Sequence, residues 1–412
     1  MEGILYSPGA GRMPPELTGR TAQLAAWDIM LNNVAAEGRR ASEDWLLLGP
    51  RGVGKTVLLT AMAERARDVG YQVLAFQAVV GGVGLVDSLR AQAGELAAHG
   101  AYWSRLVAWL GEATIGVGGV SATIRPPEAT SPGKDPTVMA RQLAGVAEAI
   151  RGKHPSGGLL ITLDEIQVAA GADLALLAAV LQQASIQCRT SPLIFAACGL
   201  PTTMTALAQA GVTHPDRLFR TEVIPQRLSP EAATQALVGP ALDREVVWEP
   251  AAVRRVLDFT LGYPAHLQLV AALTWELAPG PSTIHEADAI RGVRAAAERL
   301  ETSTLEPRWD QLTDREREYI AAVALLGPTA TTPVVSSLLG GTTASFAPVR
   351  DRLLKAGDLV STGRGRIAVA SPVFGEYVLM RYPDAVAAAA VELTALDEMR
   401  RRRSGEPPQL SG

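Results

Sequence analysis

The chain has 412 residues, which at ordinary domain size predicts two to three domains. Hydrophobic residues make up 48% of the chain and charged residues only 19%, and this composition excludes a disordered chain, a coiled-coil rod and a disulfide-stapled miniprotein. The 38 Lys and Arg residues oppose 42 Asp and Glu residues for a formal charge of −4, which argues against a protein that coats nucleic acid through a uniform positive field.

The cysteine count and the hydropathy pattern indicate the cellular compartment in which we expect the protein. Cys188 and Cys198 are too few for a disulfide framework or a four-cysteine zinc site, so both are predicted to be buried thiols in a reducing environment. Residues 1–15 contain no apolar core of signal-peptide length, and nowhere do 18 apolar residues follow one another. We therefore expect a soluble, cytoplasmic protein without a membrane span.

The first predicted strand, residues 44–48, leads into a glycine-rich motif. Its apolar run is typical of a strand buried on both faces of a parallel sheet, and residues 57–69 after the motif have helical character. The motif is a full G-x-x-x-x-G-K-[ST] match with the residues Gly49, Pro50, Arg51, Gly52, Val53, Gly54, Lys55 and Thr56. Such a loop surrounds phosphate oxygens with backbone N–H groups at a helix N-terminus. Lys55 is expected to neutralise the β- and γ-phosphates, and Thr56 to offer its hydroxyl to Mg²⁺.

A second predicted strand with a chemical signature spans residues 159–163 and ends in two acids. Asp164 is expected to join Thr56 in the Mg²⁺ shell, and Glu165 to polarise the attacking water. An acid-rich turn without function is the simpler alternative, but the phosphate loop upstream argues against it. The guanine-reading pattern Asn-Lys-x-Asp is absent from the sequence, so ATP is favoured over GTP.

The order of elements predicts the fold class. Helical stretches separate the predicted strands, which indicates a parallel sheet with helices on both faces, a three-layer α/β core. The predicted strands are residues 44–48, 72–76, 159–163, 193–197 and 222–224.

About 80 residues lie between the second and third predicted strands, more than a simple crossover needs, so we expect an insert there. We expect in it a Gly-rich loop at 79–85, a helix at 89–110, a hairpin at 115–124 and a loop at 125–136. This insert, residues 80–136, is interpreted as a second core layer or, alternatively, as a partner surface.

With these motifs in place, the sequence resembles the AAA+ superfamily of P-loop ATPases, specifically its STAND and archaeal-type branch, related to origin-recognition-like initiators. Residues 17–20 (LTGR) look like the motif that lies near the adenine in this family, and residues 164–167 (DEIQ) look like the acidic strand end of this branch. The resemblance implies ATP, ADP and Mg²⁺ as ligands. At Cys198-Gly199, after the fourth strand, the polar sensor residue of the family is missing or is replaced by the cysteine.

The same resemblance places an arginine finger just before the fifth strand. Arg217 and Arg220 lie there, and Arg220 is preferred because it is closer to the strand. A guanidinium at this place would reach the γ-phosphate of a neighbouring subunit and stabilise the transition state. The alternative is a pair of solvated helix-end arginines. With Lys55 and Glu165, Arg220 completes the expected catalytic set.

Downstream, Ser229-Pro230 has the signature of a helix start and opens a run of helices to about residue 277. Gly262, Pro264 and His266 resemble the G-x-P motif by which STAND-type lids pack on the nucleotide base. His266 stands near the place where other AAA+ lids carry a sensor arginine. A neutral imidazole cannot replace a guanidinium, so weak lid coupling and slow hydrolysis are expected. The alternative is an ordinary surface histidine.

The C-terminal third has the order of a winged helix. Helices are predicted at residues 313–326, 333–339 and 346–356, with Pro348 in the first turn of the third helix, and a hairpin turn at 362–365 follows. Residues 371–374 (SPVF) resemble the acid-Pro-x-Phe ending of the family, with Ser in place of the acid.

A winged helix would meet duplex DNA through its third helix and its hairpin. The basic residues at these places are Arg350, Arg352, Lys355, Arg364 and Arg366. Residues 308–384 hold nine Lys or Arg and eight Asp or Glu, a net charge of +1, so any DNA contact must depend on a few placed arginines. Arg400–Arg403 are interpreted as part of a solvated, frayed terminus.

The predicted organisation is a nucleotide-binding core at 1–225, a helical lid at 226–305, a winged helix at 306–384 and a tail at 385–412. The predicted function is an Mg²⁺-dependent, slowly hydrolysing ATPase switch whose nucleotide state controls homo-oligomer formation and the binding of DNA or of an effector protein. The alternatives are a DNA-binding initiator or transposition-type regulator that acts through the winged helix, and a signalling scaffold that does not bind DNA.

Overall fold

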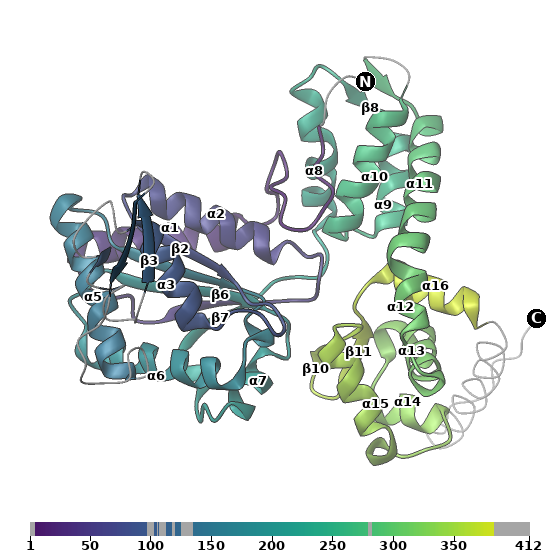
Figure 1. The fold of residues 1–412 in the computed structure, drawn as a ribbon. Helices are drawn as coiled ribbons and strands as arrows, with labels where there is room; N and C mark the ends of the chain where they lie inside the picture. The colour runs from purple at the N-terminus through teal and green to yellow at the C-terminus, as the bar shows by residue number, and fades with distance from the viewer. Residues whose placement is uncertain are drawn as a thin grey trace, which may run out of the picture.

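The computed structural model describes residues 5–96, 103, 104, 106, 113–117, 120–124, 135–278 and 282–382. Figure 1 shows an α/β core joined to a bundle of helices, below which lies a smaller C-terminal unit. The core contains, in chain order, α1 (Thr21–Glu37), β1 (Asp44–Leu48), α2 (Lys55–Asp68), β2 (Gln72–Gln77), α3 (Leu85–Leu96), β3 (Ala113–Val117), β4 (Val120–Ile124), α5 (Pro136–Lys153), β5 (Leu159–Asp164), the short helix η2 (Ile166–Val168), α6 (Gly171–Gln187), β6 (Leu193–Gly199), α7 (Thr203–Gln209), η3 (Pro215–Arg217) and β7 (Phe219–Val223).

Five strands form one parallel sheet, as the sequence predicted, and their order in the sheet is β2-β5-β6-β1-β7. The buried carboxylate of Asp44 fixes the start of β1, because it accepts a hydrogen bond from the Phe195 N–H at 2.9 Å and forms an ion pair with Arg40. The last strand begins three residues earlier than predicted. The buried ring of Phe219 extends it backwards to pair with Asp44.

Alternate residues of the central strands bury side chains on opposite faces of the sheet, which makes three layers. Leu46 and Leu48 pack with side chains of α5 and α6 in one cluster, whereas Trp45 and Leu47 pack with side chains of α1 and α2 in another. The Trp27 and Trp45 rings meet edge to face with centroids 5.4 Å apart. The three-layer α/β prediction is confirmed.

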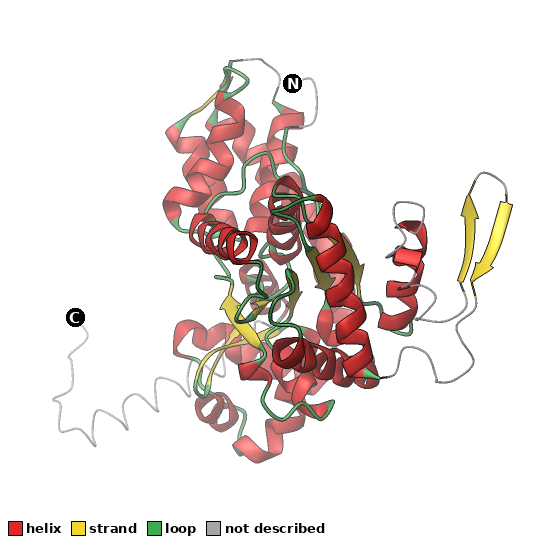
Figure 2. Ribbon diagram, turned by 90° about the vertical axis from the view of Figure 1, so that its left-hand side faces the viewer, coloured by secondary structure: helices red, strands yellow, loops and turns green. Residues whose placement is uncertain are grey.

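The insert follows the predicted order where it can be described. Residues 79–84 form a loop before α3, and β3 and β4 pair as an antiparallel hairpin that begins two residues earlier than expected. Figure 2 shows this hairpin projecting away from the rest of the core. The predicted loop at 125–134 and part of the predicted helix at 89–110 lie outside the described residues.

The helical bundle after β7, called the lid below, begins at the predicted helix start. Ser229 caps α8, and its hydroxyl accepts a hydrogen bond from the Ala232 N–H at 3.2 Å. The lid contains α8 (Pro230–Leu242), β8 (Val247–Trp248), α9 (Pro250–Thr260), α10 (Pro264–Leu277), β9 (Thr283–Ile284) and α11 (Glu286–Leu300), and the π-helical turn η4 (Glu301–Leu305) and α12 (Glu306–Asp310) extend α11 toward the C-terminal unit.

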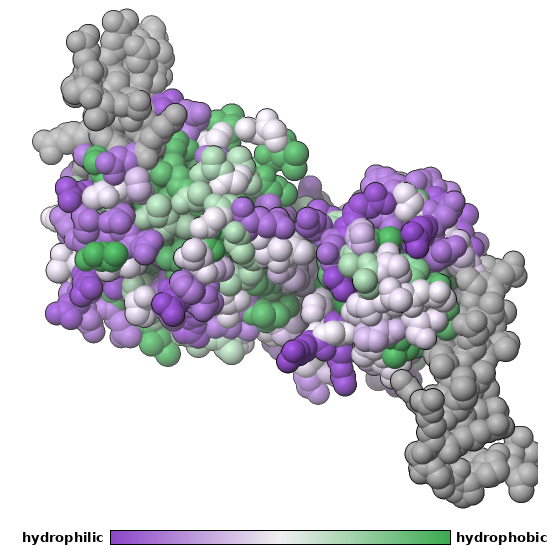
Figure 3. All heavy atoms as spheres, turned by 90° about the horizontal axis from the view of Figure 1, so that it is seen from below, coloured by the Kyte–Doolittle hydropathy of each residue, from purple (hydrophilic) through white to green (hydrophobic). Residues whose placement is uncertain are grey.

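The C-terminal unit consists of α13 (Asp314–Leu326), η5 (Gly327–Thr329), α14 (Thr332–Leu338), α15 (Thr343–Ala356), β10 (Leu359–Gly363), β11 (Arg366–Val369) and α16 (Pro372–Arg381). Three helices followed by an antiparallel hairpin is the predicted order. The lid and this unit share one continuous hydrophobic cluster. Seen from below, apolar residues gather mainly over the core, while the C-terminal unit is largely polar or neutral (Figure 3).

One local prediction in the C-terminal unit is wrong. The third helix starts at Thr343 and not at Phe346, so Pro348 lies inside α15 and not in its first turn. Thr342 and Ser345 form a reciprocal cap that fixes the earlier start, with each side-chain oxygen accepting from the backbone N–H of the other residue. The predicted tail, residues 385–412, lies outside the described residues.

Candidate nucleotide site

The glycine-rich loop lies between the end of β1 and the start of α2, where the sequence placed it. Gly52 and Gly54 adopt φ angles of 77° and 90°, in the left-handed region that favours glycine. The buried Lys55 ammonium lies back over the loop and donates a hydrogen bond to the Pro50 carbonyl at 2.8 Å. Burial lowers the pKa of Lys55, while the nearby carboxylates of Asp164 and Glu165 oppose that shift. The loop has the geometry of a phosphate-binding cradle.

Thr56 and Asp164 meet beneath the loop, although they lie far apart in the sequence. The Thr56 hydroxyl donates a hydrogen bond to Asp164 Oδ2 at 2.8 Å. A hydroxyl and one carboxylate are the protein ligands that Mg²⁺ uses beside nucleotide phosphates, so these residues fit the ion. Within the described ranges, His, Cys, Asp and Glu side chains nowhere gather in a group of three or more that would hold a metal by themselves.

Cys198 lies against the same carboxylate. Its thiol is fully buried and donates a hydrogen bond to Asp164 Oδ1 at 2.7 Å. Burial raises the pKa of Cys198 well above its ordinary value, and the charge of Asp164 adds to the shift. The thiol is therefore neutral and acts as a hydrogen-bond donor.

Glu165 follows at the carboxyl end of β5 with a φ of 53°, a left-handed conformation that is uncommon for a non-glycine residue. Its N–H donates to Asp164 Oδ1 at 2.8 Å, and its carboxylate accepts from Gln167 Nε2 at 2.5 Å. Gln167 was part of the predicted acidic strand end, but the sequence assigned it no role.

A cavity of about 620 Å³ opens beside the loop, between the core and the lid. Lys55, Thr56 and Glu165 line its phosphate side, and Thr18 and Pro264 line the side on which the base was expected. The motif at residues 17–20 is held against the phosphate loop, because the buried Arg20 guanidinium donates a hydrogen bond to the Val53 carbonyl at 2.9 Å.

Two residues of the expected lid motif, Gly262 and His266, do not line this cavity. Gly262 is buried behind the cavity, where its carbonyl accepts from the Leu228 N–H at 2.9 Å. His266 is also buried, not on the helix surface, and its ring packs on Tyr263 with centroids 4.6 Å apart. It faces a neighbouring cavity of about 510 Å³ between the phosphate loop, the lid and the C-terminal unit. Desolvation lowers the pKa of His266 to about 4.

The two arginines before the fifth strand lie apart. Arg217 is exposed at the end of η3. Arg220 lies inside β7 and not before it; it forms an ion pair with Glu222 at 3.0 Å, and its guanidinium covers the Trp45 ring. Since Arg220 pairs in register with Trp45 near the start of β1, it lies at the opposite end of the strands from the phosphate loop of its own chain.

The N-terminal segment is a part of the site that sequence reasoning missed. Residues 7–16, which precede the predicted motif at 17–20, contribute several of the residues that line the cavity beside the phosphate loop. The buried ring of Tyr6 anchors the segment in the lid, because its hydroxyl donates to the Leu237 carbonyl at 2.5 Å and accepts from Trp248 Nε1 at 3.2 Å. The sequence signal that could have identified this segment was Tyr6, the single aromatic residue near the N-terminus.

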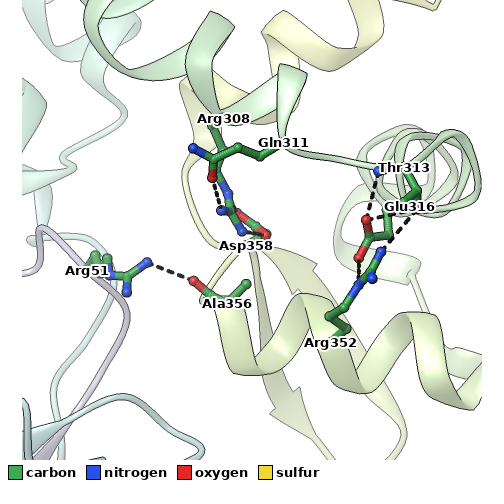
Figure 4. A network of polar contacts seen from close by, with 8 residues as sticks. All are labelled: Arg51, Arg308, Gln311, Thr313, Glu316, Arg352, Ala356 and Asp358. Carbon is green, nitrogen blue, oxygen red and sulfur yellow. Dashed lines mark hydrogen bonds and ion pairs between the residues drawn. The ribbon is translucent and has the colours of Figure 1, made fainter. Parts of the chain in front are cut away.

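The C-terminal unit contacts the phosphate loop directly. Arg51 donates a hydrogen bond to the Ala356 carbonyl, at the C-terminal end of α15, at 2.8 Å (Figure 4). Arg308 forms an ion pair with Asp358 just beyond this point. An ideal Cβ on Gly357 would lie 3.5 Å from the Leu200 side chain, so the unit also packs against the loop after β6.

The basic residues expected to contact DNA are only partly free. Arg352 pairs with the buried Glu316 carboxylate, and Arg350 pairs with Asp351 at 2.8 Å. The other three expected residues, Lys355, Arg364 and Arg366, are exposed. In the part of the chain that the structure describes, no helix is both long and apolar enough to cross a membrane.

Comparison with protein families places the nucleotide site in a known domain type. Residues 16–195 match the AAA ATPase domain, and residues 302–378 match a domain of unknown function, DUF8462. No curated protein matches the chain. Residues 16–195 are therefore an AAA ATPase domain, a nucleotide-binding module.

Solved structures agree over nearly the whole chain. The Walker-type ATPase paby2304 of Pyrococcus abyssi superimposes with a TM-score of 0.59 at 14% identity, over 91% of this chain and 99% of the other. The ORC2 protein of Aeropyrum pernix, solved as ADPNP and ADP complexes, gives a TM-score of 0.57 at 14% identity, over 94% and 100%. The chain has the three-layer P-loop AAA+ fold with a helical C-terminal region.

Proposed function

We propose that the protein is an ATP-dependent molecular switch of the STAND type, in which the nucleotide state sets how the core, the lid and the winged-helix-like C-terminal unit are arranged. The observation that carries this proposal is the contact of Arg51 with the end of α15. On its other side the same loop contacts the lid, because Tyr263 donates to the Arg51 carbonyl and the Ala265 N–H donates to the Gly52 carbonyl. A nucleotide in the loop would therefore bias both neighbours at once.

Each site residue has a role in this proposal. The loop at 49–56 and Lys55 bind the phosphates of ATP or ADP. Thr56 and Asp164 hold Mg²⁺, which when bound neutralises charge on the β- and γ-phosphates. Glu165 orients the attacking water. Arg220 acts on the nucleotide of a neighbouring subunit, since it lies far from the phosphate loop of its own chain.

Slow hydrolysis is part of the proposal, and His266 supports it. With a pKa of about 4, its imidazole is neutral at physiological pH and cannot supply a permanent positive charge. Its burial against Tyr263 also turns it toward the neighbouring cavity rather than toward the phosphates. A lid without a cation on the γ-phosphate suits a switch better than a fast motor.

The output of the switch is proposed to be self-assembly in the ATP state, together with binding of an effector protein or duplex DNA. DNA contact would depend on the exposed Lys355, Arg364 and Arg366, because carboxylates already hold Arg350 and Arg352. A DNA-binding regulator and a signalling scaffold that ignores DNA are the two forms that this output can take.

One sizing experiment tests the proposal. The full chain is sized by light scattering with ADP and with a non-hydrolysable ATP analogue, each with and without duplex DNA, and Lys55→Ala serves as the control that should lose nucleotide binding. A larger assembly with the ATP analogue alone supports the switch, and a further salt-sensitive mass gain with DNA selects the DNA-binding form. Equal mass in both nucleotides, or retained ATP binding in the Lys55→Ala protein, contradicts the proposal.

A further inference from the structure

Gln167 joins two loops at the carboxyl edge of the sheet. Its side-chain Nε2 donates to Glu165 Oε2 at 2.5 Å, and its Oε1 accepts from the Leu200 N–H at 3.0 Å. The second bond fixes the orientation of the amide, because a backbone N–H requires an oxygen opposite it. Both the nitrogen and the oxygen of the Gln167 amide are therefore hydrogen-bonded.

Gln167 occupies the space that a side chain at position 199 would otherwise fill. Gly199 has no side chain, and an ideal Cβ there would lie 2.6 Å from Gln167 Oε1 and 2.3 Å from Thr203 Oγ1. Any larger residue at the end of β6 would displace the amide. The glycine and the glutamine are thus a matched pair, in which a side chain from the β5 end occupies the place next to the β6 end.

The Glu165 carboxylate depends on this amide for its direction. The backbone of Glu165 is left-handed, and its N–H is directed to Asp164. Among the described residues, the one hydrogen bond recorded for its carboxylate comes from Gln167. A donor on Oε2 fixes the rotation of the carboxylate and leaves Oε1 to accept a hydrogen bond from water.

We propose that Gln167 is the positioning residue for Glu165: it holds the carboxylate aimed into the nucleotide cavity. This inference rests on the role of Glu165 in the proposed function. Gln167 itself does not touch substrate; it acts through Glu165 and couples that carboxylate to the Leu200 loop.

The test compares ATP hydrolysis by Gln167→Met, Gln167→Glu and Gln182→Met. Gln167→Met keeps the size of the side chain but removes both hydrogen bonds, and hydrogen bonds to charged groups are worth about one to two powers of ten in a rate. We expect kcat to fall about 10- to 100-fold, with KM for ATP within about twofold. Gln182 is exposed on α6, and its substitution should leave kcat unchanged.

Gln167→Glu supplies a readout that a merely structural role would not move. The new carboxylate can still accept from the Leu200 N–H, but it cannot donate to Glu165 and places a like charge beside it, so only the contact that aims Glu165 is lost. We therefore expect kcat to fall in Gln167→Glu as it does in Gln167→Met, with KM for ATP again within about twofold. A kcat of Gln167→Met equal to that of Gln182→Met, or a wild-type kcat in Gln167→Glu, overturns the inference.

Glu165→Gln separates this inference from the proposed function. If Glu165→Gln hydrolyses ATP like the wild type, the role of Glu165 is wrong and the inference fails with it. If Glu165→Gln is inactive while Gln167→Met keeps full activity, only the inference fails. Thermal melting and ADP affinity of each variant show that the fold and the phosphate loop are intact.

Discussion

At the scale of single residues, Cys198 shows how the site sets the chemistry of a side chain. Its thiol is fully buried against Asp164, and both burial and the adjacent carboxylate raise its pKa. Alkylation needs the thiolate, so a raised pKa lowers reactivity at any given pH. We expect Cys198 in the folded protein to resist iodoacetamide at pH 8 for hours and to react within minutes in guanidinium. Mass spectrometry of labelled peptides measures this, and rapid labelling of the native protein would contradict the burial.

His266 gives a pH-dependent stability with a definite sign. Its pKa falls from 6.5 in the unfolded chain to about 4 in the folded protein because of desolvation, so the unfolded state binds the proton first. The folded state therefore loses stability as the pH falls from 6.5 toward 4, and nothing changes above that window. Linkage gives a loss of about 2 kcal/mol between pH 7 and pH 5.

Urea unfolding of the wild type and of His266→Gln at these two pH values measures the effect. The variant should lose the part of the pH dependence that the histidine carries, whatever its stability at pH 7. If both proteins lose the same free energy of unfolding between pH 7 and pH 5, His266 is not the titrating group.

The contacts of the site differ in whether a sequence motif specifies both partners. The pairing of Thr56 with Asp164 was predictable, because the phosphate loop and the acidic strand end both follow the carboxyl ends of parallel strands in one sheet, and these ends lie along the same edge. The link from Gln167 to Leu200 and the turn of His266 away from the phosphates depend on side-chain packing. No spacing rule in the sequence encodes such contacts.

At the scale of elements, the N-terminal segment behaves as a strap across the lid. Tyr6 inserts among the lid helices and satisfies two buried polar groups, the Leu237 carbonyl and Trp248 Nε1. Tyr6→Phe keeps the ring but leaves both groups without this partner. The expected cost is about 1–3 kcal/mol in the free energy of unfolding.

Thermal and urea unfolding of Tyr6→Phe measure that cost, with Tyr382→Phe as the matched control. Tyr382 lies half-buried at the end of α16, and its ring packs on Trp309. Equal stability of the two variants would show that the Tyr6 hydroxyl contributes nothing to anchoring the strap.

Most element boundaries followed from the sequence because local signals agreed. Ser229-Pro230 marked the start of α8 correctly, since a cap and a proline at the first helical position point to the same residue. The start of α15 was misplaced because Pro348 gave that same signal inside a helix. The Thr342 and Ser345 cap upstream was the stronger determinant, and its reciprocal bonds are visible only in three dimensions.

At the scale of the whole molecule, the sequence predicted the order of core, helices and hairpin unit but not how they meet. The lid and the C-terminal unit share one hydrophobic cluster that runs along α11 and α12, so a boundary near residue 305 divides a continuous core. Contacts between distant segments have no local signature. The contact of Arg51 with Ala356 joins residues 305 positions apart through a backbone carbonyl, which any residue could have supplied.

That contact leads to the prediction with the widest consequence. Arg51 places a positive charge on the last carbonyl of α15, where the helix dipole favours a cation, and such a bond is worth about 1–2 kcal/mol. Arg51→Ala should therefore increase the population of open arrangements about 5- to 30-fold. The increase should appear as faster hydrogen exchange at residues 353–358 and as a larger radius of gyration.

Arg65→Ala is the control, because Arg65 lies in the last turn of α2, away from the phosphate loop that opens this helix, and pairs with Asp28 of α1. It should leave exchange at the end of α15 unchanged. A nucleotide phosphate that draws the Arg51 guanidinium away from Ala356 would produce the same opening in the wild type, so ATP should mimic Arg51→Ala and have little further effect on that variant. Opening by ATP that is equally large in the Arg51→Ala protein would show that the signal reaches the C-terminal unit by another route.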